Sequence, residues 1–106
     1  MKPITTTEEF NEIIAGDSKA LVKFQAGWCP DCKRMDMFID PIVEQYDDYT
    51  WYDVDRDVLP DIADKYEVMG IPSLLIFQNG EKKAHLHSAK TKTPDQITDF
   101  LESVKG

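Results

Sequence analysis

Apolar residues are spaced along the chain in two alternating ways, and each spacing predicts a different kind of element. Phe10, Ile13 and Ile14 follow the i, i+3, i+4 spacing of an amphipathic helix, which we place at residues 7–15. Compact runs rich in apolar residues predict strands. These strands are expected at residues 20–26, 50–55 and 73–78.

A single apolar face continues from Pro30 to about Tyr46 and predicts a long helix. Pro41 lies inside this stretch and cannot donate a hydrogen bond to the carbonyl of Met37. Because the apolar spacing continues past the proline, we expect one kinked helix rather than two helices. A shorter helix is expected from the helical spacing of Leu59, Ile62, Ala63 and Tyr66.

The C-terminal part of the chain predicts a hairpin followed by a helix. Asn79-Gly80 is a strong signal for a two-residue turn, so a return strand is expected over 81–88. The last helix is expected to start at Thr93, with Gln96 completing a capping box. The resulting order, α-β-α-β-α-β-β-α, predicts an α/β fold with a mixed four-stranded sheet and helices on both faces. We expect a single domain over 1–106.

Charge and composition limit the possible partners. The chain has 12 basic and 20 acidic residues, a formal net charge of −8. Nucleic acids and anionic membranes attract clustered Lys and Arg, so neither is expected as a partner. Residues 1–12 are polar and contain no apolar run typical of a signal peptide. The expected location is therefore the cytoplasm.

The two cysteines, Cys29 and Cys32, are separated by two residues. A disulfide that closes so small a loop constrains the unfolded chain very little, so a catalytic role explains the pair better than stapling. Cys29 follows a predicted strand and precedes a predicted helix, where unpaired amides favour a thiolate. Pro30 fits the first helical position without losing a hydrogen bond. Cys29 is thus the expected nucleophile, and Cys32, one turn further, the resolving thiol.

Two other interpretations of the cysteine pair remain open. Cys29 and Cys32 could form a zinc site with His85 and His87, although the spacing differs from that of compact zinc modules. They could also be two inert buried thiols. Trp28 precedes the pair and can either shield the thiols and contact a polypeptide substrate or be an ordinary half-buried aromatic residue.

A second informative segment is Gly70-Ile71-Pro72, directly before the strand at 73–78. Proline is tolerated at the first residue of a strand. A cis bond before Pro72 could expose the backbone of Ile71 for pairing with an extended substrate, whereas most X–Pro bonds are trans.

Together these segments resemble the thioredoxin family. The resemblance runs from Ala20 to the last helix and is strongest at Trp28-Cys29-Pro30-Asp31-Cys32-Lys33, at residues 70–77 and at Asn79-Gly80-Glu81. It implies a thioredoxin-like three-layer α/β/α sandwich in which Pro72 is cis and packs against the cysteines. It also implies reduction of protein or small-molecule disulfides without a metal or organic cofactor. The expected partners are such disulfides and a thioredoxin-reductase-type electron donor, and the expected state is a monomer.

The chain departs from the family pattern at three positions. Asp31 stands where the family usually has a neutral residue, and its charge is expected to raise the pKa of Cys29. Lys23 replaces a buried Asp that helps move a proton, and Asp53 on the adjacent strand is a possible partner for it. Lys23 could instead extend to solvent. With Gln25 in place of a common aromatic residue, these departures also allow a binding module that keeps the fold without general redox activity.

Overall fold

The computed structural model describes residues 1–105 and contains a five-stranded mixed sheet in the order β1-β3-β2-β4-β5. Strands β1, β3 and β2 run parallel, and β4 and β5 continue the sheet antiparallel. Gly106, the last residue of the expected domain, lies outside the described residues. The strands are β1 (Lys2–Ile4), β2 (Ala20–Gln25), β3 (Thr50–Asp55), β4 (Ser73–Gln78) and β5 (Glu81–Leu86).

The expectation of a four-stranded sheet is wrong by one edge strand. β1 pairs in parallel with β3, with Lys2 opposite Tyr52 and Ile4 opposite Val54. Only Ile4 of its three residues is buried. Three residues with a single apolar anchor carry no periodic signal, so the pairing depends on the neighbouring strand rather than on local sequence.

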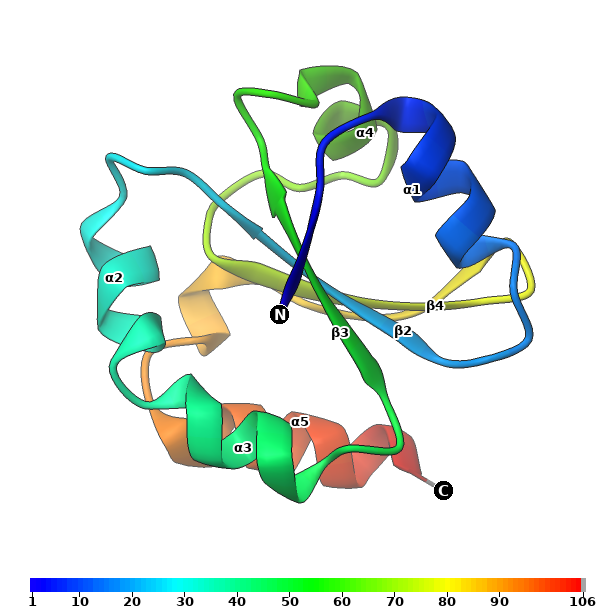
Figure 1. Ribbon diagram of the computed structural model, residues 1–106. Helices are drawn as coiled ribbons and strands as arrows, with labels where there is room; N and C mark the ends of the chain where they lie inside the picture. Colours follow the sequence, from blue (N-terminus) through cyan, green and yellow to red (C-terminus); the bar gives the residue numbers. More distant parts are fainter. Residues whose placement is uncertain (106) are drawn as a thin grey trace.

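Helices cover both faces of the sheet, which confirms the three-layer α/β/α arrangement (Figure 1). α1 (Thr7–Ile14) and α4 (Pro60–Lys65) lie on one face, whereas α3 (Ile39–Gln45) and α5 (Pro94–Lys105) lie on the other. α2 (Pro30–Asp36) follows the C-terminal end of β2. Each face has its own apolar core, centred on Phe10, Phe24 and Phe77 in one case and on Met35 and Leu74 in the other.

The expectation of one kinked helix from Pro30 to Tyr46 is also wrong, because the chain forms two helices. The helical hydrogen bonding stops after Asp36, and Phe38 has φ −130°, outside the helical range. Pro41 has no amide hydrogen for the carbonyl of Met37, and its ring crowds that carbonyl. The proline therefore lies in the first turn of α3, where no intrahelical donor is needed.

Two local motifs form as the sequence predicts. Asn79 and Gly80 have φ values of +54° and +81°, so both adopt the left-handed conformation of a type I′ hairpin turn. Thr93 and Gln96 exchange hydrogen bonds at the start of α5 and form the expected capping box. The return strand ends at Leu86 rather than at residue 88, because Ser88–Lys90 forms a short 3₁₀ helix. None of the helices in residues 1–105 is long and apolar enough to cross a bilayer.

Candidate active site

The backbone places Cys29 where β2 has ended and α2 begins. Its amide donates to the carbonyl of Ala26 at 3.2 Å, and its own carbonyl accepts from Lys33 at 3.2 Å, which is the first hydrogen bond of α2. Cys29 is thus the N-cap residue, and Pro30 occupies the first helical position, as expected. This geometry holds the sulfur of Cys29 at the free amide groups of the first helical turn.

Cys29 and Cys32 form a disulfide, with their Cα atoms 5.3 Å apart. The amide of Cys32 donates to Sγ of Cys29 at 3.1 Å. A hydrogen bond to this sulfur stabilises its charged form most strongly, so the same amide would favour a thiolate after reduction. Each cysteine is 2% exposed, and the pair lies in a small apolar cluster with Ala26 and Ile71.

The loop before β4 brings Ile71 and Pro72 against the disulfide. The bond between them is cis, and the carbonyl oxygen of Ile71 lies 3.8 Å from Sγ of Cys29. Thr91, which is 2% exposed, holds this loop by donating from its hydroxyl to the carbonyl of Pro72 at 3.2 Å. Thr91 did not stand out in the sequence, because nothing there links it to a proline 19 residues away.

Trp28 lies beside the pair with 64% of its surface exposed. Its indole Nε1 donates to Oδ2 of Asp57 at 2.7 Å, in the turn after β3. Of the two interpretations of Trp28, the ordinary half-buried aromatic residue does not fit this exposure. The side chain is an exposed apolar surface held in one orientation at the border of the site.

Comparison with known proteins decides the family. The family model described as Thioredoxin matches residues 2–103. Thioredoxin-1 of Saccharomyces cerevisiae is 40% identical over 84 residues, which are 79% of this chain and 82% of that protein. A thioredoxin of Callithrix jacchus is 32% identical over 104 residues, which are 95% of this chain and 99% of that one. The chain belongs to the thioredoxin family.

A solved thioredoxin structure supports the fold independently. The thioredoxin of Malassezia sympodialis superposes with a TM-score of 0.86 at 23% identity and covers 99% of this chain and 93% of its own. Together with the Cys29–Cys32 pair, family membership makes this chain a thiol–disulfide oxidoreductase that acts on disulfide-containing substrates.

Lys23, which the resemblance placed at the position of the family's buried aspartate, is 4% exposed. Lys23 lies opposite Asp53 in the ladder between β2 and β3, but its ammonium pairs with the carboxylate of Asp36 on α2. Burial raises the pKa of Asp53, whereas the charge of Lys23 lowers it. Oδ1 of Asp53 has no hydrogen-bond partner among the described residues. Lys23 is therefore buried rather than solvent-directed, and Asp36 is a site residue that sequence reasoning missed.

Asp31, between the two cysteines of this thioredoxin-family site, is paired with Lys92. The ammonium of Lys92 donates to Oδ2 of Asp31 at 2.5 Å, and both side chains are about two-fifths exposed (41% and 40%). This hydrogen bond and the charge of Lys92 lower the pKa of Asp31, and Arg34 adds to the effect. The two residues are 61 positions apart, and no sequence pattern connects them.

The histidines of the zinc alternative do not join the cysteines. His85 and His87 stack on each other at the end of β5, with ring centroids 3.8 Å apart. Nδ1 of His85 lies 3.1 Å from Nζ of Lys82. Within residues 1–105, no group of three or more His, Cys, Asp or Glu side chains is placed to hold a metal ion. The four proposed zinc ligands are thus not brought together.

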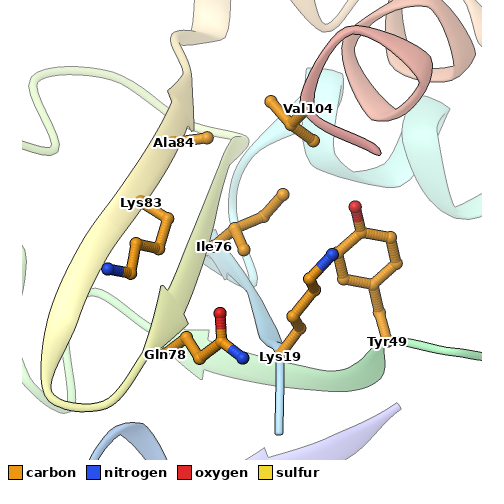
Figure 2. Close-up of a pocket in the computed structure, with 7 residues that line it drawn as sticks. All are labelled: Lys19, Tyr49, Ile76, Gln78, Lys83, Ala84 and Val104. Carbon is orange, nitrogen blue, oxygen red and sulfur yellow. The ribbon is translucent and has the colours of Figure 1, made fainter. Parts of the chain in front are cut away.

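A cavity of about 360 Å³ opens at the other end of the sheet, near the start of β2 and the end of β4 (Figure 2). Its lining contains Lys19 and Tyr49 on one side, Ile76 on its floor and Val104 from α5. No residue of the cysteine site lines this cavity. The cysteine pair and this cavity are therefore separate features of the described structure.

Proposed function

We propose that this protein reduces disulfides in proteins or small molecules, with Cys29 as the attacking thiol and Cys32 as the resolving thiol. The observation that carries the proposal is the position of Cys29 at the N-cap of α2. There its sulfur accepts from the amide of Cys32 and faces the carbonyl of Ile71.

The proposed reaction proceeds in two exchanges. The Cys29 thiolate attacks one sulfur of the substrate disulfide, forms a mixed disulfide and releases the first substrate thiolate, which takes up a proton. The thiolate of Cys32 then attacks Sγ of Cys29, which releases the second substrate thiolate and closes the Cys29–Cys32 disulfide. The second substrate thiolate also takes up a proton. The substrate has gained two electrons and two protons, which the two thiols of the protein have lost, so the protein is left oxidised.

The surroundings of the cysteines suggest where a substrate is held. Ile71 and Pro72 form one wall beside Cys29, and the cis bond presents the carbonyl of Ile71 towards the sulfur. We propose that an extended segment of a substrate pairs with the backbone of this loop. The exposed ring of Trp28 supplies an apolar contact on the border.

Three residues are proposed to modulate the thiols. Pro30 sets the start of α2, and Asp31 places a carboxylate in the first turn of α2, in the sequence between the two cysteines. Asp36 follows Cys32 by one turn of α2 and binds the buried ammonium of Lys23. We propose that this positive charge favours the thiolate form of Cys32.

The reaction sequence needs a partner that restores the dithiol. We propose a thioredoxin-reductase-type electron donor, a monomeric state and a cytoplasmic location, where small-molecule thiols keep cysteines reduced. The net charge of −8 supports the absence of nucleic acids and anionic membranes from the set of partners.

The decisive experiment compares two single variants that serve as controls for each other. Cys29→Ser is expected to abolish reduction of insulin or of a model disulfide, because the nucleophile is lost. Cys32→Ser is expected to accumulate a mixed disulfide on Cys29, visible by mass spectrometry, because no thiol resolves it. Trapping on Cys32 in Cys29→Ser instead would reverse the roles. A folded wild-type protein that reduces no disulfide with any reductant would favour the binding module.

A further inference from the structure

The charge of Asp31 does not act on the cysteines alone, because Lys92 reaches it from the loop before α5. Asp31 is the second residue of α2 and stands between Cys29 and Cys32 in the sequence. Its carboxylate is held by the ammonium of Lys92 at 2.5 Å. A carboxylate and an ammonium at this distance form a neutral pair whose field falls off faster than that of an isolated charge.

The backbone of Lys92 is fixed on both sides. On one side the hydroxyl of Thr91 donates to the carbonyls of Pro72 and Ser88, at 3.2 and 2.9 Å. On the other, the amides of Lys92 and Thr93 both donate to Oε1 of Gln96, at 2.7 and 3.2 Å. An exposed ion pair is usually weak because its long side chains must be ordered. An anchored backbone removes part of this cost.

The same short segment therefore contacts both halves of the site. Thr91 holds the proline loop that faces Cys29, and Lys92 holds the carboxylate inside the Cys29–Cys32 turn. Other charged groups also lie near the turn. They add an electrostatic effect that is the same in every variant of the Asp31–Lys92 pair. They are Lys33 and Arg34 on α2, Asp57 at Trp28, and the Lys23, Asp36 and Asp53 group beneath α2.

We propose that Lys92 is a positioning residue of the active site, which holds and neutralises Asp31 so that Cys29 ionises as though a neutral residue separated the two cysteines. The proposal rests on the proposed function in taking Cys29 as the reactive thiol. It implies that a chain with a carboxylate between its cysteines still forms a thiolate at Cys29 when the disulfide is reduced. It also makes the loop before α5 a determinant of thiol reactivity.

The test measures the ionisation of Cys29 rather than disulfide reduction. In a Cys32→Ser background, where Cys29 is the only thiol, alkylation by iodoacetamide is followed across a pH series. The compared forms are the parent, Lys92→Gln, Lys92→Arg, Asp31→Asn and the double variant Asp31→Asn/Lys92→Gln. Circular dichroism and thermal melting check that each form is folded.

The expected pattern singles out one variant. Lys92→Gln exposes the charge of Asp31, so alkylation below the thiol pKa slows by about threefold and the pH profile moves to higher pH. Asp31→Asn and the double variant stay close to the parent, because a neutral pair has been replaced by neutral or hydrated groups. Lys92→Arg keeps the parent profile, and the effect of Lys92→Gln shrinks in high salt.

Three results would overturn the proposal. One is a parent-like profile for folded Lys92→Gln. Another is a several-fold faster alkylation of Asp31→Asn alone, which would mean that the carboxylate acts unscreened. The third is an effect of Lys92→Gln that is equally large in the parent and in the Asp31→Asn variant. Alkylation needs no disulfide substrate. Failure of the wild-type protein to reduce disulfides would therefore refute the proposed function, whereas the alkylation rates would still test the role of Lys92.

Discussion

At the scale of single residues, the buried ammonium of Lys23 is a charged group with two carboxylate neighbours, Asp36 and Asp53. Lys23 is surrounded by two carboxylates with different environments, because Asp36 is 60% exposed whereas Asp53 is half buried. The pKa of Asp53 reflects both neighbours: burial raises it most, Lys23 lowers it and Asp36 raises it. The pKa of Asp53 therefore measures how strongly the charges of Lys23 and Asp36 act at this place.

Replacing Lys23 by Met is expected to raise the pKa of Asp53, because the carboxylate stays buried while the charge that favours its ionised form is lost. The protein should stay folded, since the released Asp36 is exposed and remains hydrated. The measurement is an NMR titration of the Asp53 carboxyl carbon. Asp36→Asn is the matched control and should lower the same pKa, because its repulsive charge is gone and Lys23 can turn to Asp53. An unchanged pKa of Asp53 in Lys23→Met would show that the charge of Lys23 does not act on Asp53.

Residue-scale features were predictable only where the chemistry is local in sequence. Cys29, Cys32 and Pro30 lie within one turn, so their spacing alone predicts the N-cap position and the disulfide. Asp36 and Lys92 escaped notice, because their partners are 13 and 61 positions away. A charged residue on the surface of a helix has many possible partners, and only the folded chain selects one.

At the scale of elements, α5 depends on its capping box. The hydroxyl of Thr93 accepts from the amide of Gln96 at 3.3 Å, and the side chain of Gln96 accepts from the amide of Thr93 at 3.2 Å. Thr93→Ala is expected to lower the free energy of unfolding by about 1 kcal/mol, since it leaves an amide at the helix start without a partner. Urea unfolding followed by circular dichroism measures the change.

Thr98 in the interior of α5 provides the matched control for this prediction. Its hydroxyl donates to the carbonyl of Asp95, a bond within the helix that competes with regular helix geometry. Thr98→Ala should therefore be neutral or stabilise the protein by about 0.5 kcal/mol, because alanine has the higher helix propensity. Equal losses in the two variants would show that the cap has no special role.

The elements were predictable where a periodic face or a turn motif specifies them, as for β3, β4 and the Asn79-Gly80 hairpin. The break between α2 and α3 was not, because the apolar spacing continues unchanged across Met37 and Phe38. Periodicity reports which face is buried, whereas Pro41 decides whether the hydrogen-bond ladder is continuous. A kinked helix and two consecutive helices bury the same residues, so the sequence pattern could not separate them.

At the scale of the whole molecule, the cysteine pair follows the end of β2, whereas the cavity near Tyr49 opens near the start of β2 (Figure 2). Each face has a continuous apolar core, so local substitutions at the site need not unfold the domain. Global stability should instead respond to the few ionisable groups whose pKa values change on folding. His85 on β5 is the strongest example.

The pKa of His85 is lowered to about 4, first by burial and then by His87 and Lys82. Its neutral Nδ1 lies 3.1 Å from the ammonium of Lys82, and its Nε2 is buried without a partner among the described residues. The folded state therefore resists protonation of His85, whereas the unfolded chain binds a proton near about pH 6.5. This contribution to stability is complete above about pH 6.5 and is lost as the pH falls towards about 4.

Wild-type protein should therefore lose about 1 kcal/mol of unfolding free energy between about pH 7.5 and about pH 5, discounting for the partial exposure of His85. His85→Gln should lose much less over the same interval, as measured by urea unfolding at both pH values. His87→Gln is the control. Its free energy of unfolding should fall almost as much as that of the wild type, because burial, the main cause of the lowered pKa of His85, remains. The raised pKa of Asp53 acts with the opposite sign, but it is present in all three proteins and cancels in the comparison. If the free energy of unfolding falls equally with decreasing pH in the wild type and in His85→Gln, other groups cause the loss.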